Sequence, residues 1–514
     1  MKELSVSSAG SARQARRRAR VAAVSLVATA SLVGTYLGAL RPQATYASTG
    51  RGAVETRNGF APPLSGCEEV PGTKTYVDDD TKLQAAVTAS TDGDNVCITG
   101  TSGFRLSKTL VLDDTSITLM GDDSSISLLP APNGDDTSLR HLYVDFSDDG
   151  DDSVIIRSLT FTGDDTVSSS GGAIEFNGGT DRDEMFIYDS VFQNNISSKQ
   201  GGAIYANDRV EIFSSVFAGN RADEGGAVYS EDLVDVTGSL FTGNQAYYGG
   251  AISADSRRID VYTSTFRSNR AVRDGSGDGG YGGAIYGDGA GVYIYDSVFE
   301  ANTAESRGGS LFLNNDSWGV YTSTFKDNQV TLTDDTAVGG GAIYAKDGDL
   351  DIEESYFSNN YAKSGGGLWV YSNSHYARIT NSAFVGNDAT SVGAGLYAGP
   401  DDSAWIRIEG SSFVRNGNDT APQTGGGLSV IGDSTESFIT SSTVWGNRAK
   451  FRGAGMSWNN ERSASSPEDI LQLSYLTVVD NELLEGNPAA PRNWGAGILF
   501  EKGDPEVYLV NSLV

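Results

Sequence analysis

Acidic side chains recur at regular intervals in the middle of this chain, and they are the first candidates for chemistry. Glu211, Asp235 and Asp260 each stand between two aliphatic residues. Enzymes that cleave polysaccharides use either a pair of carboxyl groups or an arginine or lysine base beside acid-bound calcium. A catalytic site normally interrupts a repeat, whereas regular recurrence is the signature of a solvated strand face. The sequence therefore predicts no catalytic residues and no enzyme, with a polysaccharide lyase or hydrolase as the alternative.

The sequence contains no motif that indicates a catalytic histidine or a metal site. The chain has two histidines, His141 and His375, and neither lies in a motif, so both are interpreted as surface or turn residues. No cofactor is predicted. Calcium is the one ion that acidic turns, such as Gly275–Gly280 or Asp334–Asp335, could hold loosely.

A row of aromatic residues is the second candidate surface. Each ring follows the apolar residue of a Gly-Gly-Ala-Ile-like tetrad, and strand alternation turns it outward. Stacked rings stabilise neighbouring strands, and a flat row of rings is also a platform for sugars or for a partner protein. The predicted ligand-binding residues are Tyr205, Tyr229, Tyr286, Phe312, Tyr344, Trp369 and Tyr397.

A repeated element must position these residues. Between residues 161 and 481 the chain places Phe or Val three residues before Asn or Asp twelve times, in alternation with the glycine tetrads. From Phe192 to Phe413 the spacing of the copies varies between 24 and 33 residues. That variation is too large for an array of helical hairpins and fits a constant coil with variable loops.

One repeat contains three short runs of strand-forming residues, for example Ala203–Tyr205, Val210–Ile212 and Val216–Phe217. A single repeat cannot bury its apolar sides, so the coils must stack, with equivalent strands about 4.8 Å apart. The asparagine of each copy is expected to hydrogen-bond to its equivalents along the stack. The prediction is an all-β parallel β-helix of about 12 coils, with its repeats over residues 136–514.

The N-terminal region carries export signals. An arginine-rich segment precedes the apolar run Val21–Leu40 and the sequence Thr45–Ala47, which is typical of a signal peptide over residues 1–47. An uncleaved membrane anchor is the alternative. Residues 48–66 are interpreted as a linker.

Residues 67–135 are predicted to hold an N-terminal cap and the first coils. Cys67 and Cys97 are the two cysteines, and an exported protein meets an oxidising compartment, so a disulfide is expected between them. Thr81–Ala89 predicts a helix that covers the open end of the first coil. At the other end the repeat pattern runs to Val514 with no capping sequence, so we expect the sequence to be part of a longer protein.

The net charge of -30 and the pI near 4.3 exclude a nucleic-acid binder, because a phosphate polymer would be repelled.

The alternating Gly-Gly-Ala-Ile and Phe-x-x-Asn tetrads resemble the repeats of the polymorphic outer membrane proteins, from about residue 158 to residue 514. The resemblance implies a right-handed β-helix that is displayed on, or released from, a bacterial envelope and used for adhesion. The segment Leu83–Val87, which leads into Asp94–Ile98, is similar to the opening of secreted pectin-lyase-like β-helices. Both resemblances imply the same fold.

The sequence thus predicts a secreted or surface-displayed binding protein at the cell envelope or outer-membrane surface. Its expected partners are a host-cell protein, a matrix protein or a glycan. A passive surface stalk is a further alternative.

Overall fold

The computed structural model describes residue 67 and residues 73–513, apart from 101–102, 122–126, 131–139, 148–149, 164–165, 180–181, 256, 333–338, 374–375, 402–404, 418–421, 432–435, 460–469, 485–495 and 502–505. The predicted signal peptide and linker, Asp334–Asp335 and His375 lie outside the described residues. Residues 63–514 form one compact unit. Among the described residues, no helix has both the length and the apolar composition needed to cross a membrane.

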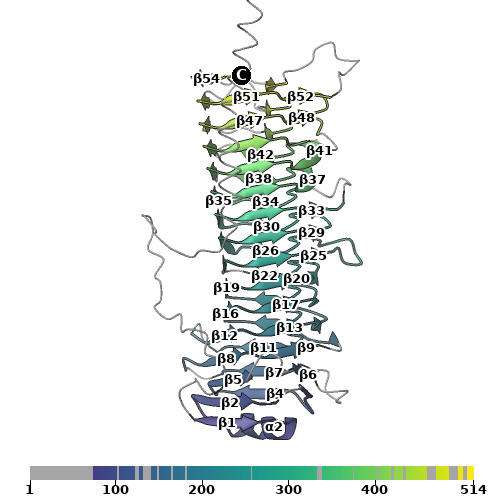
Figure 1. Ribbon diagram of the computed structural model, residues 1–514, viewed down its shortest axis with the longest axis vertical. Helices are drawn as coiled ribbons and strands as arrows, with labels where there is room; N and C mark the ends of the chain where they lie inside the picture. Colours follow the sequence, from purple (N-terminus) through teal and green to yellow (C-terminus); the bar gives the residue numbers. More distant parts are fainter. Residues whose placement is uncertain are drawn as a thin grey trace, which may run out of the picture. The chain divides into compact units, whose positions relative to one another are not determined.

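The described chain winds into a parallel β-solenoid, whose coils stack from β1 and α2 at one end to β54 at the other (Figure 1). Sheet A has 16 strands, all paired in parallel. They are β1 (Lys74–Val77), β2 (Asp94–Ile98), β5 (Ile117–Gly121), β8 (Ser153–Arg157), β12 (Glu184–Tyr188), β16 (Arg209–Phe213), β19 (Leu233–Thr237), β23 (Arg258–Tyr262), β27 (Gly291–Tyr295), β31 (Ser317–Tyr321), β35 (Asp349–Glu353), β39 (Tyr376–Thr380), β43 (Trp405–Glu409), β46 (Glu436–Thr440), β50 (Ile470–Ser474) and β54 (Glu506–Val510).

Sheet B contains the phenylalanine positions and has 14 strands. They are β3 (Phe104–Arg105), β6 (Ser127–Leu129), β9 (Thr160–Thr162), β13 (Val191–Gln193), β17 (Val216–Ala218), β20 (Leu240–Thr242), β24 (Thr265–Arg267), β28 (Val298–Glu300), β32 (Thr324–Lys326), β36 (Tyr356–Ser358), β40 (Ala383–Val385), β44 (Ser412–Val414), β47 (Thr443–Trp445) and β51 (Thr477–Val479).

Sheet C follows the glycine tetrads, also has 14 strands, and runs down the middle of Figure 1. They are β4 (Leu110–Asp113), β7 (Leu142–Asp145), β11 (Ile174–Asn177), β15 (Ile204–Ala206), β18 (Val228–Ser230), β22 (Ile252–Asp255), β26 (Ile285–Asp288), β30 (Leu311–Asn314), β34 (Ile343–Lys346), β38 (Leu368–Asn373), β42 (Leu396–Asp401), β45 (Leu428–Ile431), β49 (Met456–Asn459) and β53 (Ile498–Glu501).

A fourth short strand, which the sequence did not predict, forms between sheets B and C in ten of the described coils. Six of these strands make sheet D, and two further pairs stand apart from it. Sheet D contains β21 (Gln245–Ala246), β25 (Arg270–Ala271), β29 (Thr303–Ala304), β33 (Gln329–Val330), β37 (Tyr361–Ser364) and β41 (Asp388–Val392); the pairs are β10 (Thr166–Val167) with β14 (Ile196–Ser197) and β48 (Arg448–Ala449) with β52 (Glu482–Leu483).

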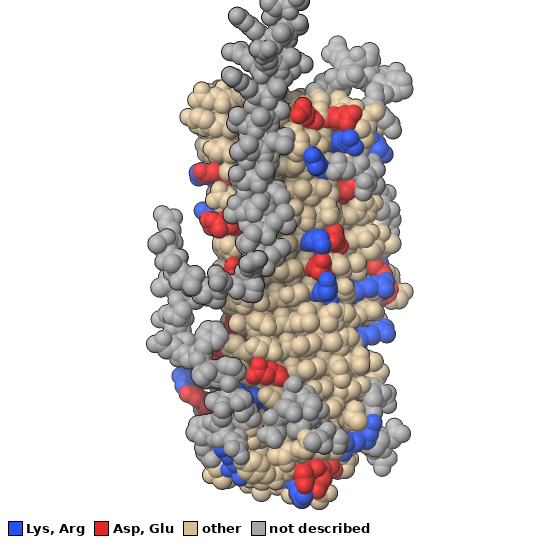
Figure 2. Space-filling view, in the orientation of Figure 1, with Lys and Arg blue, Asp and Glu red and all other residues tan. Residues whose placement is uncertain are grey.

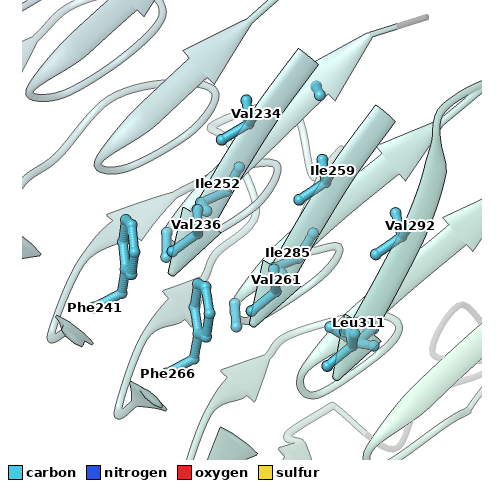
Figure 3. Packing of buried hydrophobic residues seen from close by; sticks show 14 of the residues in the cluster. Val234, Val236, Phe241, Ile252, Ile259, Val261, Phe266, Ile285, Val292 and Leu311 are labelled. Carbon is cyan, nitrogen blue, oxygen red and sulfur yellow. The ribbon is translucent and has the colours of Figure 1, made fainter. Parts of the chain in front are cut away.

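The interior is built from columns of equivalent apolar residues. Figure 3 shows part of it, where Phe241 and Phe266 from neighbouring coils of sheet B stack beside Val236 and Val261 of sheet A. From Phe161 to Phe413 the phenylalanine rings are fully buried and lie face to face at 4.6 to 5.0 Å between ring centroids. This confirms the inward position predicted for the repeated phenylalanine.

His141 is a correction to the sequence-based interpretation, because the structure places it in the core and not at the surface. Its side chain is fully buried, and its ring lies edge-on to Phe161 at 5.4 Å, at the first ring of the phenylalanine column. Its Nε2 lies 3.0 Å from the carbonyl oxygen of Leu128. The imidazole ring therefore packs edge-on against the end of the phenylalanine column, where the strand register continues with Leu128.

The asparagines form the predicted ladder through the turn after sheet B. In each coil Nδ2 donates to Oδ1 of the next asparagine at 2.9 to 3.1 Å, through eleven coils from Asn195 to Asn481. The same Oδ1 also accepts the backbone N–H of the asparagine one coil earlier, as Asn220 does for Asn195. Because these groups are buried, each bond satisfies a donor that would otherwise lose its water.

A parallel serine ladder, whose role sequence reasoning missed, precedes sheet B. Ser215 Oγ accepts the backbone N–H of Ser190 at 3.1 Å and donates to the carbonyl of Phe213 at 2.8 Å. The pattern recurs up to Ser442. Serine in the Ser-x-Phe-x-x-Asn motif was visible in the sequence, but its function depends on the neighbouring coil.

The predicted N-terminal helix is present as α2 (Asp80–Ala89), with Asp79 as its N-cap. It contacts β1, β2 and β4 and places Leu83 and Val87 in the solenoid core. The side chains of Cys67 and Cys97 are buried in one cluster with Met120.

Candidate binding surfaces on sheets C and A

The predicted aromatic row lies on the outer side of sheet C. Tyr205, for example, stands between Ile204 and Ala206, which both point into the core. The strand register places the seven predicted rings in one column, which Ser253 interrupts once. From Tyr286 to Tyr397 the column is aromatic in five successive coils.

The rings stack on one another along this column. Neighbouring centroids lie 4.3 to 5.8 Å apart, and the planes of Tyr344 and Trp369 differ by 5°. Tyr281 and Tyr371 pack against the same column, and sequence reasoning missed both. Tyr281 immediately precedes a glycine tetrad, and this position could have signalled a second row.

The expected exposure of the row is corrected by the structure. Tyr229, Phe312, Tyr344 and Trp369 are buried, with 3 to 7% of their surface exposed, whereas Tyr205, Tyr286 and Tyr397 are half-buried. The physical reason is that rings of the two adjacent coils cover both faces of Phe312, Tyr344 and Trp369. Tyr229 is covered on one face by Tyr205. Strand alternation gives the direction of a side chain but not what its neighbours cover.

Polar groups complete the packing of the row. The hydroxyls of Tyr205 and Tyr229 donate to Glu231 at 2.7 Å and to Asp255 at 2.9 Å, one coil further along. The guanidinium of Arg307 lies 5.5 Å from the centroid of the Tyr344 ring. Burial raises the pKa of Tyr344 to about 12, so this hydroxyl stays protonated at neutral pH. In Figure 2 the visible charged side chains on this side of the molecule stand in small separate groups between uncharged surface.

The acidic column on sheet A also differs from the expected solvated face. Glu211, Asp235 and Asp260 lie at the same register position of β16, β19 and β23 and point outward. Their side chains are 17%, 20% and 9% exposed. Arg209 contacts Glu211 at 2.7 Å and Asp235 at 2.8 Å, and Arg258 contacts Asp260 at 2.8 Å. The alternation of apolar and charged residues along each strand predicted that these carboxylates are solvated. In the structure the arginine side chains cover them.

Asp260 is the most perturbed acid of this column. Burial raises its pKa and the charge of Asp235 adds to the effect, against the lowering contribution of Arg258, so that the pKa reaches about 6. An unfolded aspartate titrates near 3.9. The folded state thus binds the proton more tightly, and stability is lost as the pH rises from about 4 to about 6.

We expect Asp260→Asn to remove this loss. At pH 7.5 the free energy of unfolding of the coils that contain β19, β23 and β27 should be about 2 kcal/mol higher in the variant than in the parent chain. The reason is that a neutral amide replaces a desolvated carboxylate. At pH 4 the two proteins should be equal. Hydrogen exchange of peptides from residues 230–295, corrected for the intrinsic rate at each pH, measures the difference. A variant that is less protected at pH 7.5 would contradict the expectation.

The predicted loose calcium turn is closed by its own hydrogen bonds. In this loop the Asp274 carboxylate oxygen Oδ1 accepts from the backbone N–H groups of Ser276 and Asp278, at 2.8 and 2.9 Å, and from the Ser276 hydroxyl at 2.7 Å. In the described part of the chain, no group of three or more His, Cys, Asp or Glu residues is arranged to hold a metal ion.

A third surface, which sequence reasoning missed, lies further along sheet A. Tyr376 pairs with Trp405, and Arg378 pairs with Arg407, on the adjacent strands β39 and β43. All four side chains point outward, because Ala377, Ile379, Ile406 and Ile408 between them fill the core. The residues are 29 positions apart in the sequence, so nothing local signals the arrangement.

Three segments of the chain match the model of a known repeat family. Residues 189–207, 238–255 and 322–346 match the model of the Chlamydia polymorphic membrane protein repeat. The chain carries the polymorphic membrane protein repeat. The first match contains Phe192, Asn195 and the tetrad that begins at Gly201, which are a ring of the buried column, an amide of the asparagine ladder and the glycines that lead into β15. In this chain Phe192 and Asn195 of the matched segment therefore serve the packing of the coils.

No curated protein sequence matches the chain closely enough to count as a relative. Among solved structures, the A-module of the mannuronan C-5 epimerase AlgE6 of Azotobacter vinelandii aligns with 85% of this chain and 95% of its own, at 13% identity and a TM-score of 0.32. Tailspike protein 3 of bacteriophage CBA120 aligns with 80% of this chain and 59% of its own, at 13% identity and a TM-score of 0.37. The PL6 family alginate lyase AlyGC covers 85% of this chain and 100% of its own, at 10% identity and a TM-score of 0.26. These TM-scores are too low to bear on function.

Proposed function

We propose that the protein is displayed at a bacterial cell surface and binds cells, matrix or glycans through the outer face of sheet C. The observation that carries the proposal is the aromatic column from Tyr286 to Tyr397, which stands outside the core on a scaffold with a membrane-protein repeat. Tyrosine and tryptophan dominate the binding energy of many interfaces. Rings that are already stacked lose little conformational freedom when a partner binds.

The stacking favours a particular kind of partner. The ring faces are used within the column, so a partner meets ring edges and the half-buried Tyr286 and Tyr397. Five coils at about 4.8 Å extend over about 20 Å. An elongated, flat protein surface or an extended glycan fits this geometry better than a small ligand, which needs a concave pocket.

We expect the double variant Tyr286→Ser/Tyr397→Ser to lose at least tenfold in attachment to host cells or matrix. Serine is the residue that the chain itself places in this column at Ser253, so the fold should tolerate it. The matched control is Tyr295→Ser/Tyr321→Ser, because these half-buried tyrosines also stack outward, at 4.9 Å, but on sheet A. The measurement is binding of purified protein to cells and to matrix and glycan arrays, with circular dichroism as the control of folding.

Equal loss in both double variants would contradict a role specific to sheet C. If the parent chain itself binds nothing in these assays, the proposal fails and the passive stalk takes its place.

The proposed function is non-catalytic. The carboxylates of the acidic column on sheet A are engaged by Arg209 and Arg258, which is the arrangement of a structural ion-pair network. Secretion, removal of residues 1–47 and a disulfide between Cys67 and Cys97 belong to the same proposal. The shared cluster of Cys67, Cys97 and Met120 supports the disulfide.

A further inference from the structure

Two strands of sheet A combine an aromatic stack with two arginines. The indole of Trp405 stacks on the ring of Tyr376, with 4.9 Å between centroids and 12° between planes. Beside this stack, Arg378 and Arg407 occupy opposite positions of the register. Their side chains are 43% and 51% exposed, so both guanidinium groups reach the surface.

Each arginine keeps donors available beyond its own ion pair. Arg378 uses Nε to bind Asp351 at 2.6 Å, and Arg407 uses one terminal nitrogen to bind Glu409 at 3.1 Å. Among the described residues these are the only hydrogen bonds of the two guanidinium groups. A guanidinium has five N–H donors, so several remain directed away from these acids. The pair of Arg407 with Glu409 is exposed on both sides and contributes little to stability.

Two like charges at directly opposite positions of a sheet repel each other. The repulsion between Arg378 and Arg407 is relieved when an anion lies between them. The strands are about 4.8 Å apart, a separation that one carboxylate, with two oxygens, can bridge. Trp405 stands two residues before Arg407 on the outer side of β43 and is half-buried. Its indole, stacked on one side by Tyr376, is an apolar surface next to the two charges on which a sugar ring can pack.

We propose that Arg378, Arg407 and Trp405 form a binding site for a glycan that carries a single carboxylated sugar. The carboxylate accepts hydrogen bonds from both guanidinium groups, and the sugar ring packs on Trp405. The site lies on sheet A, so it is separate from the surface proposed above on sheet C and does not depend on it.

The net charge of the protein favours binding of a glycan with one acidic sugar over binding of a polyanionic glycan. The net charge of -30 repels a chain with a charge on every unit. Asp351 and Glu409 flank the two arginines and oppose any further negative group near the site. A glycan with one carboxylate and otherwise neutral units gains the local attraction without this repulsion.

The test uses the full chain and three soluble probes in saturation-transfer difference NMR, with titration to obtain Kd. The probes are 3′-sialyllactose, with one carboxylate; lactose, the same sugar without it; and trigalacturonate, with a carboxylate on every unit. We expect saturation transfer to sialyllactose with a Kd of about 1 mM or tighter, and at least tenfold weaker binding of the other two. Added salt should weaken the binding of sialyllactose.

The variant Arg407→Glu should lose at least tenfold in affinity for sialyllactose, and Arg407→Lys should keep part of it. The matched control is Arg267→Glu, an exposed arginine on sheet B that is also paired, with Glu300 at 2.9 Å. Because Arg407 is exposed, its replacement should leave the melting curve unchanged. The proposal is overturned if sialyllactose shows no transfer, if lactose or trigalacturonate binds as tightly, or if Arg407→Glu binds like the Arg267→Glu control.

Discussion

Replacing Phe217 by alanine is expected to destabilise the coils around it by about 3 to 5 kcal/mol, the range found for large-to-small changes in a core. The side chain is fully buried, with the ring of Phe192 at 4.8 Å on one side and that of Phe241 at 4.7 Å on the other. Alanine removes both contacts and leaves a cavity inside a column that cannot collapse without moving neighbouring strands.

Hydrogen exchange, read coil by coil, is the appropriate measurement, because damage in a linear repeat can remain local. The peptides from residues 190–250 should lose protection, while those beyond residue 300 should keep theirs. Phe213→Ala is the matched control, since Phe213 belongs to the same coil but points outward and is half-buried. Equal effects of the two replacements would contradict the inward assignment.

The second large effect is expected from a single methyl group. In Gly283→Ala the new Cβ would lie 2.0 Å from the carbonyl oxygen of Gly309 in the next coil and 2.7 Å from that of Thr303. Both atoms belong to the backbone, so the neighbouring coil must shift as a whole. We expect a loss of more than about 3 kcal/mol, at the upper end of the range for overpacking.

Gly275→Ala provides the control for this change, because a Cβ at Gly275 has no atom within 4 Å and the residue lies in a surface loop. Thermal melting and hydrogen exchange of residues 280–315 compare the two variants. The steric explanation fails if Gly283→Ala melts at the same temperature as Gly275→Ala.

The stacked β-solenoid could be predicted from the sequence alone, because each residue position that packs in the core recurs in many coils. Phe217 and Asn220 have equivalents in coil after coil, so their inward positions and their ladder followed from recurrence. The alternation of Val210 and Ile212 around Glu211 likewise predicted a strand, which is β16 of sheet A. A local pattern with a period of two reports on which side of a strand a residue lies.

What covers a residue, and which residues meet across coils, was decided by the tertiary structure. Alternation directed Tyr344 outward, but stacking against Phe312 and Trp369 determined that it is buried. Arg378 and Arg407 became neighbours only because the chain between them closes one full coil. Contacts along the solenoid axis join positions that are 24 to 34 residues apart through loops of variable length, so their partners emerge only when the coils stack in register.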